Sequence, residues 1–156
     1  MEGIQQILND WAEQTRQELI STYRRKGLKA SGAFEDGLTT DTTESRTQIW
    51  TVPHTWYMVH GRGKNSSQDK DAVRKWVGWA GSTFLKKWVD DKGLDISPFA
   101  VAYKIARQGI RVPNENNDGK LISEVITTKS ISGLLEKMGA YNITDIKTDI
   151  QKTWQQ

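Results

Sequence analysis

Apolar side chains recur at steps of three and four over the first 26 residues. This spacing predicts one long amphipathic helix from residue 3 to about residue 26, ended by Gly27. Its apolar stripe is longer than a small domain needs to bury. Part of the stripe, with Trp11 or Tyr23 near an anchor, is therefore a candidate contact between subunits. The stripe consists of Ile4, Ile7, Leu8, Trp11, Thr15, Leu19 and Tyr23.

Between residues 39 and 52 the pattern changes to alternation, with many Thr residues. Such a stretch favours a pair of antiparallel strands, here turning near Glu44–Ser45. Residues 31–37 are expected to form a short turn or helical piece before this pair, and residues 56–60 a third short strand after it. The predicted sheet is small and antiparallel.

A second amphipathic helix is predicted from Asp69 or Asp71 to Gly93, because apolar residues again recur at helical spacing. Gly78 and Gly81 weaken this helix, since each costs about 1 kcal/mol relative to Ala in a helix interior. Their presence indicates that another backbone packs closely against it.

A third helix has a well-marked start. Ser97 is a favourable N-cap, and Pro98 at the first helical position loses nothing by lacking an N–H group. This helix is predicted to run to Gln108, with Gly109 just beyond its end. Residues 114–119, rich in Asn, are the most loop-like stretch of the chain.

The last part of the chain is predicted to be mainly helical. Residues 121–138 form one or two helical pieces, with Ser130 as an N-cap and Gly139 as the end. The apolar residues of the tail, residues 143–154, again have helical spacing, although alternation with Thr also permits a strand.

The composition is that of a folded chain without disulfides. Of the 156 residues, 36% are hydrophobic and 26% are charged, and seven Trp argue against disorder. With no linker or repeat, residues 1–156 are predicted to form one α+β domain, a long N-terminal helix packed on a small antiparallel sheet with further helices. No stretch approaches the ~20 apolar residues that cross a bilayer, so no membrane partner is expected.

The net charge of +3 is too small to indicate nucleic-acid binding by itself. The excess is local, in a basic patch at the end of the first helix. Cations there favour the negative end of the helix dipole, so the patch is either a C-terminal cap or an anion-binding site. It consists of Arg24, Arg25, Lys26 and Lys29.

Catalytic and metal-binding patterns are weak. His54 and His60 would share one face of the predicted third strand, but no third His and no Cys completes a zinc site. Glu35–Asp36 and Asp90–Asp91 are interpreted as solvated loop charge, and Gly61-x-Gly63-Lys64 lacks the spacing of a phosphate-binding loop. We therefore predict no catalytic, cofactor-binding or metal-binding residue, no small-molecule substrate and no enzymatic activity.

The Trp residues point to protein contacts instead. Trp11, Trp76 and Trp88 lie on apolar stripes and are predicted to belong to the core. The others exceed what the core of one domain needs, and aromatic residues are enriched at protein interfaces, so some are expected to lie between subunits. These are Trp50, Trp56, Trp79 and Trp154.

Three short strings follow the long helix in order: Ala30–Leu38, Trp56–Gly63 and Ile96–Phe99. Together they resemble the family of tailed-bacteriophage neck and tail-completion proteins, which join the DNA-filled head to the tail. In that family a small-Gly-bulky-acidic turn follows the first helix, an aromatic strand ends in a Gly-rich loop, and Pro-Phe opens a later helix. The matching residues are Gly32, Phe34, Leu38, Tyr57, Val59, Gly61, Pro98 and Phe99.

The resemblance implies a structural protein of the virion that forms a homo-oligomeric ring around the DNA channel and performs no chemistry. It would be made in the bacterial host cytoplasm, and its partners would be the portal or connector and tail proteins. Basic residues would face either adjoining rings or DNA in the channel. We expect the loop of residues 61–67, with Arg62, Gly63 and Lys64, to dock onto a neighbouring protein.

The alternative class is a basic nucleic-acid-binding module. It would combine the basic patch with Arg62, Lys64, Arg107 and Arg111. Phosphate binding would make its affinity fall steeply with salt, whereas a ring assembled through apolar contacts would respond less.

Overall fold

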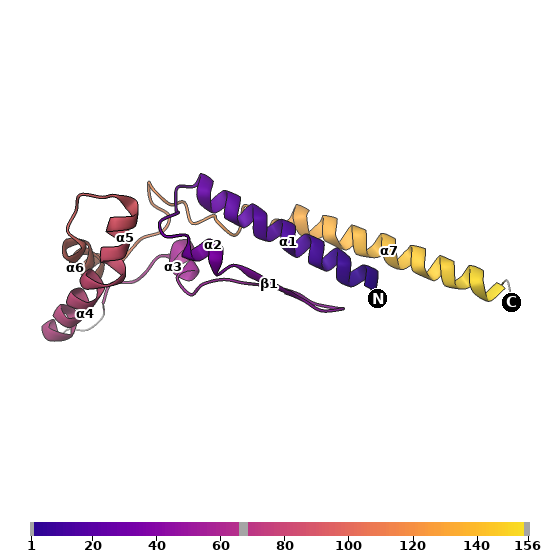
Figure 1. Cartoon of the computed structure of the whole chain (residues 1–156), viewed down its shortest axis with the longest axis horizontal. Coiled ribbons are helices and arrows are strands. Elements are labelled where there is room, and N and C mark those ends of the chain that lie inside the picture. The colour runs from indigo at the N-terminus through magenta and orange to yellow at the C-terminus, as the bar shows by residue number, and fades with distance from the viewer. Residues whose placement is uncertain (1, 66–68, 155–156) are drawn as a thin grey trace.

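The computed structural model describes residues 2–65 and 69–154. A long N-terminal helix, a small antiparallel sheet and further helices give the α+β class that the sequence predicts. Figure 1 shows an elongated molecule, with α4, α5 and α6 at one end and the C-terminal part of α7 at the other. In chain order the elements are α1 (Glu2–Arg25), α2 (Ala33–Asp36), β1 (Thr39–Thr42), β2 (Thr47–Trp50), α3 (Thr55–His60), α4 (Lys70–Ser82), α5 (Phe84–Lys92), α6 (Pro98–Gln108) and α7 (Thr128–Trp154).

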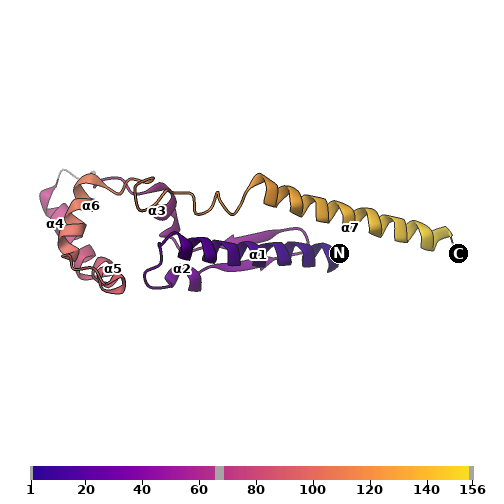
Figure 2. The same cartoon turned by 90° about the horizontal axis from the view of Figure 1, so that it is seen from above.

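Helix α1 and the β-hairpin follow the sequence prediction. Strands β1 and β2 pair antiparallel from Thr39 with Trp50 to Thr42 with Thr47, so the turn contains Glu44–Ser45. Helix α1 packs against both strands and against α7. Figures 1 and 2 both show α7 running on past the N-terminal end of α1.

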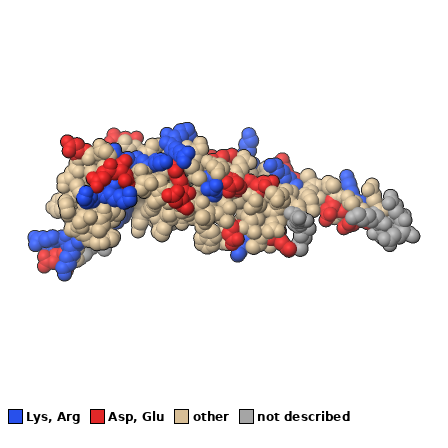
Figure 3. All heavy atoms as spheres, viewed as in Figure 1, with Lys and Arg blue, Asp and Glu red and all other residues tan. Residues whose placement is uncertain are grey.

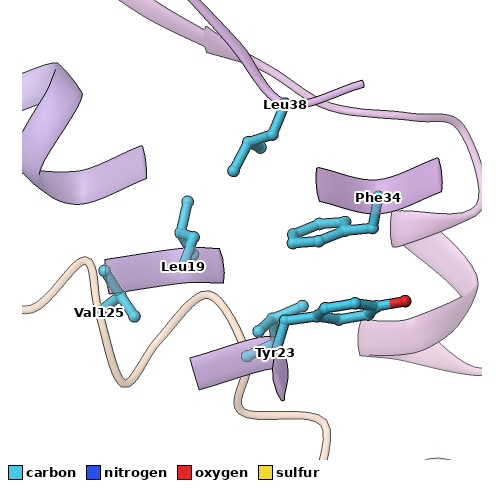
Figure 4. Close-up of a cluster of buried hydrophobic side chains, with 6 residues drawn as sticks. Leu19, Tyr23, Phe34, Leu38 and Val125 are labelled. Carbon is cyan, nitrogen blue, oxygen red and sulfur yellow. The ribbon is translucent and has the colours of Figure 1, made fainter. Parts of the chain in front are cut away.

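One buried cluster joins α1 and α2 to the segment that precedes α7, and we call it the proximal core. The rings of Tyr23 and Phe34 lie 4.5 Å apart between centroids and are tilted by 31° (Figure 4). Burying an apolar side chain of this size stabilises the fold by roughly 1.5–3 kcal/mol. The members of the proximal core are Leu19, Tyr23, Phe34, Leu38, Leu121 and Val125.

A second cluster forms where α4, α5 and α6 meet, and we call residues 69–109 the distal lobe. Its buried members are small: Ala80 and Ala102 are joined only by Leu85. A Cβ at Gly81 would collide with the ring of Phe99, so a side chain packs closely at this glycine and the predicted approach of another backbone is wrong. Gly78 has open space around it, and no packing requirement explains it.

The start of α6 is confirmed in detail. The Ser97 hydroxyl accepts a hydrogen bond from the Ala100 N–H at 3.4 Å, and Pro98 occupies the first turn. Gly109 follows the last helical residue, as predicted.

The predicted third strand, residues 56–60, is wrong, because this segment is helix α3. Its aromatic and β-branched residues favour a strand, but a run of six residues is too short for periodicity to distinguish the two structures. The helix begins at Thr55, two residues after Pro53, and the N–H of Trp56 bonds to the Pro53 carbonyl at 3.3 Å. The described sheet therefore has two strands.

The helix predicted from residue 69 to residue 93 is two helices, α4 and α5, that meet at Thr83. Thr83 donates its hydroxyl hydrogen to the Trp79 carbonyl at 2.6 Å, and Ser82 donates to the Gly78 carbonyl at 2.7 Å. Both hydroxyls bond back to carbonyls in the last turn of α4, next to the break.

The predicted boundaries around α7 are also wrong. Helix α7 begins at Thr128, because the Thr127 hydroxyl, rather than Ser130, accepts a hydrogen bond from a backbone N–H of the first turn. Gly139 does not end the helix, which continues to Trp154. One interior Gly costs only about 1 kcal/mol, less than a long helix can offset elsewhere. The helical alternative for the tail is thereby confirmed, and the strand alternative is wrong.

Candidate functional site

Two cations of the basic patch, Arg24 and Lys29, lie beside α2. Arg24 Nε is 2.7 Å from Glu35 Oε1, and Lys29 Nζ is 3.3 Å from Glu35 Oε2. The Glu35 side chain is only 12% exposed. Hydrogen bonds from Arg24 lower the pKa of Glu35 from 4.5 to about 2, with a smaller contribution from Lys29. Glu35 is therefore an ion-pairing residue and not the solvated loop charge that the sequence suggested.

The other two cations reach a segment almost a hundred residues away. Lys26 Nζ lies 2.7 Å from both Asp118 Oδ2 and Glu124 Oε1, and Arg25 Nη2 lies 3.1 Å from Glu124 Oε2. Hydrogen bonds from Lys26 lower the pKa values of Asp118 and Glu124, and the same bonds raise the pKa of Lys26. These pairs attach the end of α1 to the chain just before α7.

The basic patch is therefore not the open anion-binding site that was one of its two interpretations. Arg24, Arg25, Lys26 and Lys29 each have a carboxylate partner within the chain. On the face shown in Figure 3, basic and acidic side chains lie intermingled. The partners come from residues 35, 118 and 124, and no local sequence pattern marks the two distant ones.

The Gly61 loop is held against the end of α6 by backbone contacts. Arg62 and Ile110 form an isolated antiparallel bridge, with N–H to carbonyl distances of 2.8 and 2.7 Å. Gly61 has φ +75° and Gly109 has φ +72°, and a Cβ on either would collide with backbone atoms of the opposite segment. Both glycines are therefore required by a close approach of two backbones.

The side chain of Arg62 stabilises the junction between the Gly61 loop and the end of α6. Its guanidinium lies 4.4 Å from the centroid of the Trp76 ring in α4, and its Nη2 donates to Asn65 Oδ1 at 2.7 Å. Arg62 Nη1 is buried and has no hydrogen-bond partner among the described residues. The Asn65 N–H bonds to the Ala106 carbonyl of α6 at 2.9 Å.

The side chain of Arg62 is engaged within its own chain, where it stacks on Trp76 of α4 and bonds to Asn65, and its docking role stays a prediction. Gly63 and Lys64 are exposed and stay candidates for an interface. Ser66 and Ser67 lie outside the described residues.

Trp11 and Tyr23, the two residues of α1 proposed as anchors of a subunit contact, differ in exposure. Tyr23 is 4% exposed and packs in the proximal core, so it is not available to a neighbouring subunit and that prediction is wrong. Trp11 is half-buried and keeps part of its surface accessible. The sequence does not distinguish the two positions, because both lie on the same apolar stripe. Tyr23 is the more buried of the two because Phe34 packs on it.

The other Trp residues differ in exposure, and the predicted place of the surplus ones between subunits stays a prediction. Trp50, Trp56 and Trp79 are exposed, at 54%, 65% and 58%. Trp76, predicted to belong to the core, is half-buried and packs against the buried cluster of the distal lobe. Trp88 was also predicted to belong to the core but is 37% exposed, so that prediction is wrong. The side chain of Trp154 lies outside the described residues.

The two histidines do not form a site. His54 is the N-cap of helix α3 and His60 is its last residue, so they do not share one face of a strand. The ring of His60 packs on Trp56 with centroids 4.1 Å apart. Within the described residues, no group of three His, Cys, Asp or Glu side chains could hold a metal ion.

An apolar groove of about 650 Å³ runs between α3 and the segment before α7. It is lined mainly by Val52, Pro53, Trp56, Val59, Ile122 and Ile126. The sequence did not indicate this groove, because its two walls are some 65 residues apart and neither carries a recognisable motif.

Helix α7 carries a row of exposed large apolar side chains. They recur at helical spacing along most of its length and face away from the chain. None of the described helices is both long and apolar enough to cross a membrane. The members of the row are Ile131, Leu135, Ile143, Ile146 and Ile150.

Comparison of the chain with protein-family models, with curated proteins and with solved structures finds no match.

Proposed function

We propose that the chain is a structural protein of a tailed-bacteriophage virion, placed at the neck between portal and tail. In this proposal it forms a homo-oligomeric ring around the DNA channel and performs no chemistry. Its partners are other copies of itself, the portal or connector and the tail proteins. The first and third sequence strings support the family, whereas the second matches it in sequence only, because residues 56–60 belong to helix α3 and not to a strand. The accessible surface supports the assembly.

The accessible surface is the observation that carries the proposal. The chain exposes 11024 Å². A compact monomer of 17.7 kDa is expected to expose about 8,000 Å². The excess of about 3,000 Å² is well above the ~800 Å² that each partner buries in a standard interface. A chain of this shape is suited to an assembly in which neighbours cover the excess.

The kind of surface that is exposed also supports assembly. Among the described residues, sixteen large hydrophobic side chains are exposed, whereas thirteen hydrophobic residues are buried and four of these are Ala. Extended exposed apolar patches mark interaction sites more often than free surface. They lie around α3, over the distal lobe and along α7.

The elongated form supports a ring over a compact two-fold dimer. Apolar patches near both ends allow one surface of each copy to contact a different surface of the next. Such heterologous contacts generate a closed ring when the rotation between copies closes.

The nucleic-acid-binding alternative has less support. The basic patch on which it depended is paired with carboxylates, and Arg62 stacks on Trp76. Of the residues it invoked, Lys64, Arg107 and Arg111 are exposed.

The proposal is tested on particles of a phage that encodes this chain. We expect mass spectrometry to find the chain in purified virions and cryo-electron microscopy to place it between portal and tail. Its absence from mature virions, or a position elsewhere in the particle, would contradict the proposal. Native mass spectrometry of the purified chain should show closed oligomers whose masses change little between low and moderate salt.

A further inference from the structure

The charges of the chain are separated between two of its regions. Residues 62–111, the distal lobe with the loops that lead into and out of it, carry eleven Lys and Arg and five Asp, a net charge of +6. Residues 2–18 and 39–50, the first part of α1 and the hairpin, carry two Arg and six Asp and Glu, a net charge of −4. Of the total of +3, this leaves +1 for the other residues. The small net charge of the chain therefore combines one basic and one acidic region.

Four cations of the basic region lie around the second half of α6. Lys104 and Arg107 are on α6, which contains no Asp or Glu, and Arg111 follows two residues after Gly109. Lys64 lies beside them, because its backbone N is 2.9 Å from the position that a Cβ on Gly109 would take. All four side chains belong to exposed residues, and none has a carboxylate partner within residues 2–65 and 69–154. We call these four residues the α6 basic face.

Four exposed carboxylates of the acidic region lie on the first part of α1 and near the tip of the hairpin. The two elements meet there, since Gln5 Nε2 lies 3.5 Å from the Thr42 carbonyl oxygen. Of the two Arg in this region, Arg16 pairs with Glu13, and Arg46 is exposed beside the hairpin turn. The four carboxylates have no ion-pair partner in the part of the chain that the structure describes. We call them the acidic surface, which consists of Asp10, Glu18, Asp41 and Glu44.

The α6 basic face and the acidic surface cannot meet within one copy. Figures 1 and 2 show the distal lobe at one end of the molecule, whereas the hairpin and the N-terminal end of α1 point away from it. Helix α7, which also packs on α1, has four Lys and three acidic residues and therefore adds little net charge. Complementary potentials determine which surfaces of two molecules meet, so these two surfaces favour contact between copies.

We infer that the α6 basic face of one copy docks on the acidic surface of the next copy, head to tail. The inference rests on the proposed homo-oligomer and names the two different surfaces that a heterologous contact in a ring requires. Charges at an interface act mainly on orientation and on the rate of encounter, whereas the covered apolar area holds the assembled copies together. Salt should therefore slow assembly and leave the masses of the assembled oligomers the same.

A second copy is favoured over a nucleic acid as the partner of the α6 basic face. The phosphates of a nucleic acid would also attract these cations. They would leave the acidic surface without a partner, however. A second copy neutralises both surfaces in one contact, and both surfaces are present on the chain itself.

Charge reversal in the full-length chain tests this contact. The lobe variant carries Lys104→Glu and Arg107→Glu, and the hairpin variant carries Asp41→Lys and Glu44→Lys. All four side chains are exposed and lie outside both buried clusters. At low salt we expect the dissociation constant for self-association, measured by sedimentation equilibrium, to rise about tenfold in each variant, because like charges then meet.

The control variant carries Lys129→Glu and Lys137→Glu, at exposed positions of α7. It makes the same change in net charge as the lobe variant but leaves both surfaces intact. We expect it to associate like the unaltered chain. A tenfold loss in this control as well would show that total charge, and not the α6 basic face, governs association.

Combining the reversals distinguishes a head-to-tail contact from other arrangements. A mixture of equal amounts of the lobe and hairpin variants should form oligomers that contain both, detected by native mass spectrometry, because each reversed surface then meets its opposite. A chain with all four substitutions should associate with itself about as tightly as the unaltered chain. It should not assemble together with the unaltered chain, since like charges would meet at every mixed contact.

Other results would overturn the inference. Lobe and hairpin variants that associate like the unaltered chain would exclude both surfaces from the contact, while the proposed ring would stand. Two weakened variants that do not combine would show that the surfaces do not contact each other. A lobe variant that keeps its self-association and loses affinity for a short DNA duplex would assign the α6 basic face to nucleic acid. If the unaltered chain is monomeric at every concentration, the contact and the homo-oligomer fail together, and its presence in virions still tests the location.

Discussion

The proximal core and the distal lobe each bury one cluster of apolar side chains, but the side chains differ in size. The proximal core contains Phe34, Tyr23 and four branched aliphatic residues, and ion pairs span 92 to 99 residues around it. The buried cluster of the distal lobe is two Ala and one Leu, with the half-buried Trp76 packed against it, while Trp79, Phe84 and Trp88 of the lobe are exposed.

The difference indicates which region contributes most of the stability of the fold and which region exposes apolar surface that other proteins can contact. Large buried side chains stabilise a fold more than Ala does, because they remove more apolar area from water. We therefore expect the distal lobe to open before the proximal core. The exposed aromatics of the lobe, such as Trp79 and Phe84, whose rings touch edge to face at 5.5 Å, are available to neighbours in an assembly.

Phe34→Ala has the largest expected effect. It should lower the free energy of unfolding by about 3–5 kcal/mol, because it leaves a cavity beside Tyr23 in the proximal core. Urea denaturation followed by Trp fluorescence measures the loss. The matched control is Phe84→Ala in the distal lobe: its side chain is 49% exposed, so it should cost only about 1 kcal/mol. Equal losses would remove the distinction between the two regions.

Gly61→Ala tests the junction between the regions. The positive φ and the nearby Ile110 carbonyl make a Cβ costly there, so the variant should lose about 1–3 kcal/mol of stability. Gly63→Ala, two residues along with open space around it, should change stability little. Thermal unfolding by circular dichroism compares them, and a Gly61→Ala variant as stable as Gly63→Ala would show that the junction is not closely packed.

Arg62→Ala should destabilise the same junction by about 1–2 kcal/mol, because it removes the cation–π contact with Trp76 and the bond to Asn65. Lys64→Ala, at an exposed position, should stay within about 0.5 kcal/mol. Hydrogen exchange of α4 amides should quicken in the first variant and not in the second. Unchanged exchange in both would mean that Arg62 does not hold the lobe in place.

The smallest expected effect is the acid dependence of the proximal region. The pKa of Glu35 falls from 4.5 to about 2 on folding, so its contribution is present above pH 4.5 and is lost as the pH falls toward 2. Glu35→Gln should flatten the stability curve in that window. The control Glu44→Gln, at the exposed hairpin turn, should leave the curve as it is, and an unchanged slope in Glu35→Gln would show that the pair with Arg24 adds nothing.

Part of the architecture was predictable because its signals are local. The stripe of α1, the alternation of the hairpin and the Ser97–Pro98 start of α6 each reflect bonds between residues a few positions apart. Helix α3 was not predictable, since six residues fit both periods equally well.

The candidate surfaces were predictable only in part. The excess of Trp predicted contacts between subunits, and Trp56 is exposed, as such a contact requires. The length of the α1 stripe made Tyr23 a candidate anchor, but Phe34 covers it. Arg62 was expected at the surface as a charged loop residue, whereas the return of the chain at Ile110 and the nearby Trp76 enclose it.

By itself the sequence determined the periods of the helices and the hairpin, their strongest caps, the α+β class and the weakness of any catalytic pattern. The tertiary structure decided which charges are neutralised, which aromatics are covered, and that α7 continues past the body of the chain. The physical reason is the sequence separation between the residues that interact. A helix or turn forms from bonds between near neighbours, but the pairing of Lys26 with Asp118 depends on the path of the 91 residues between them.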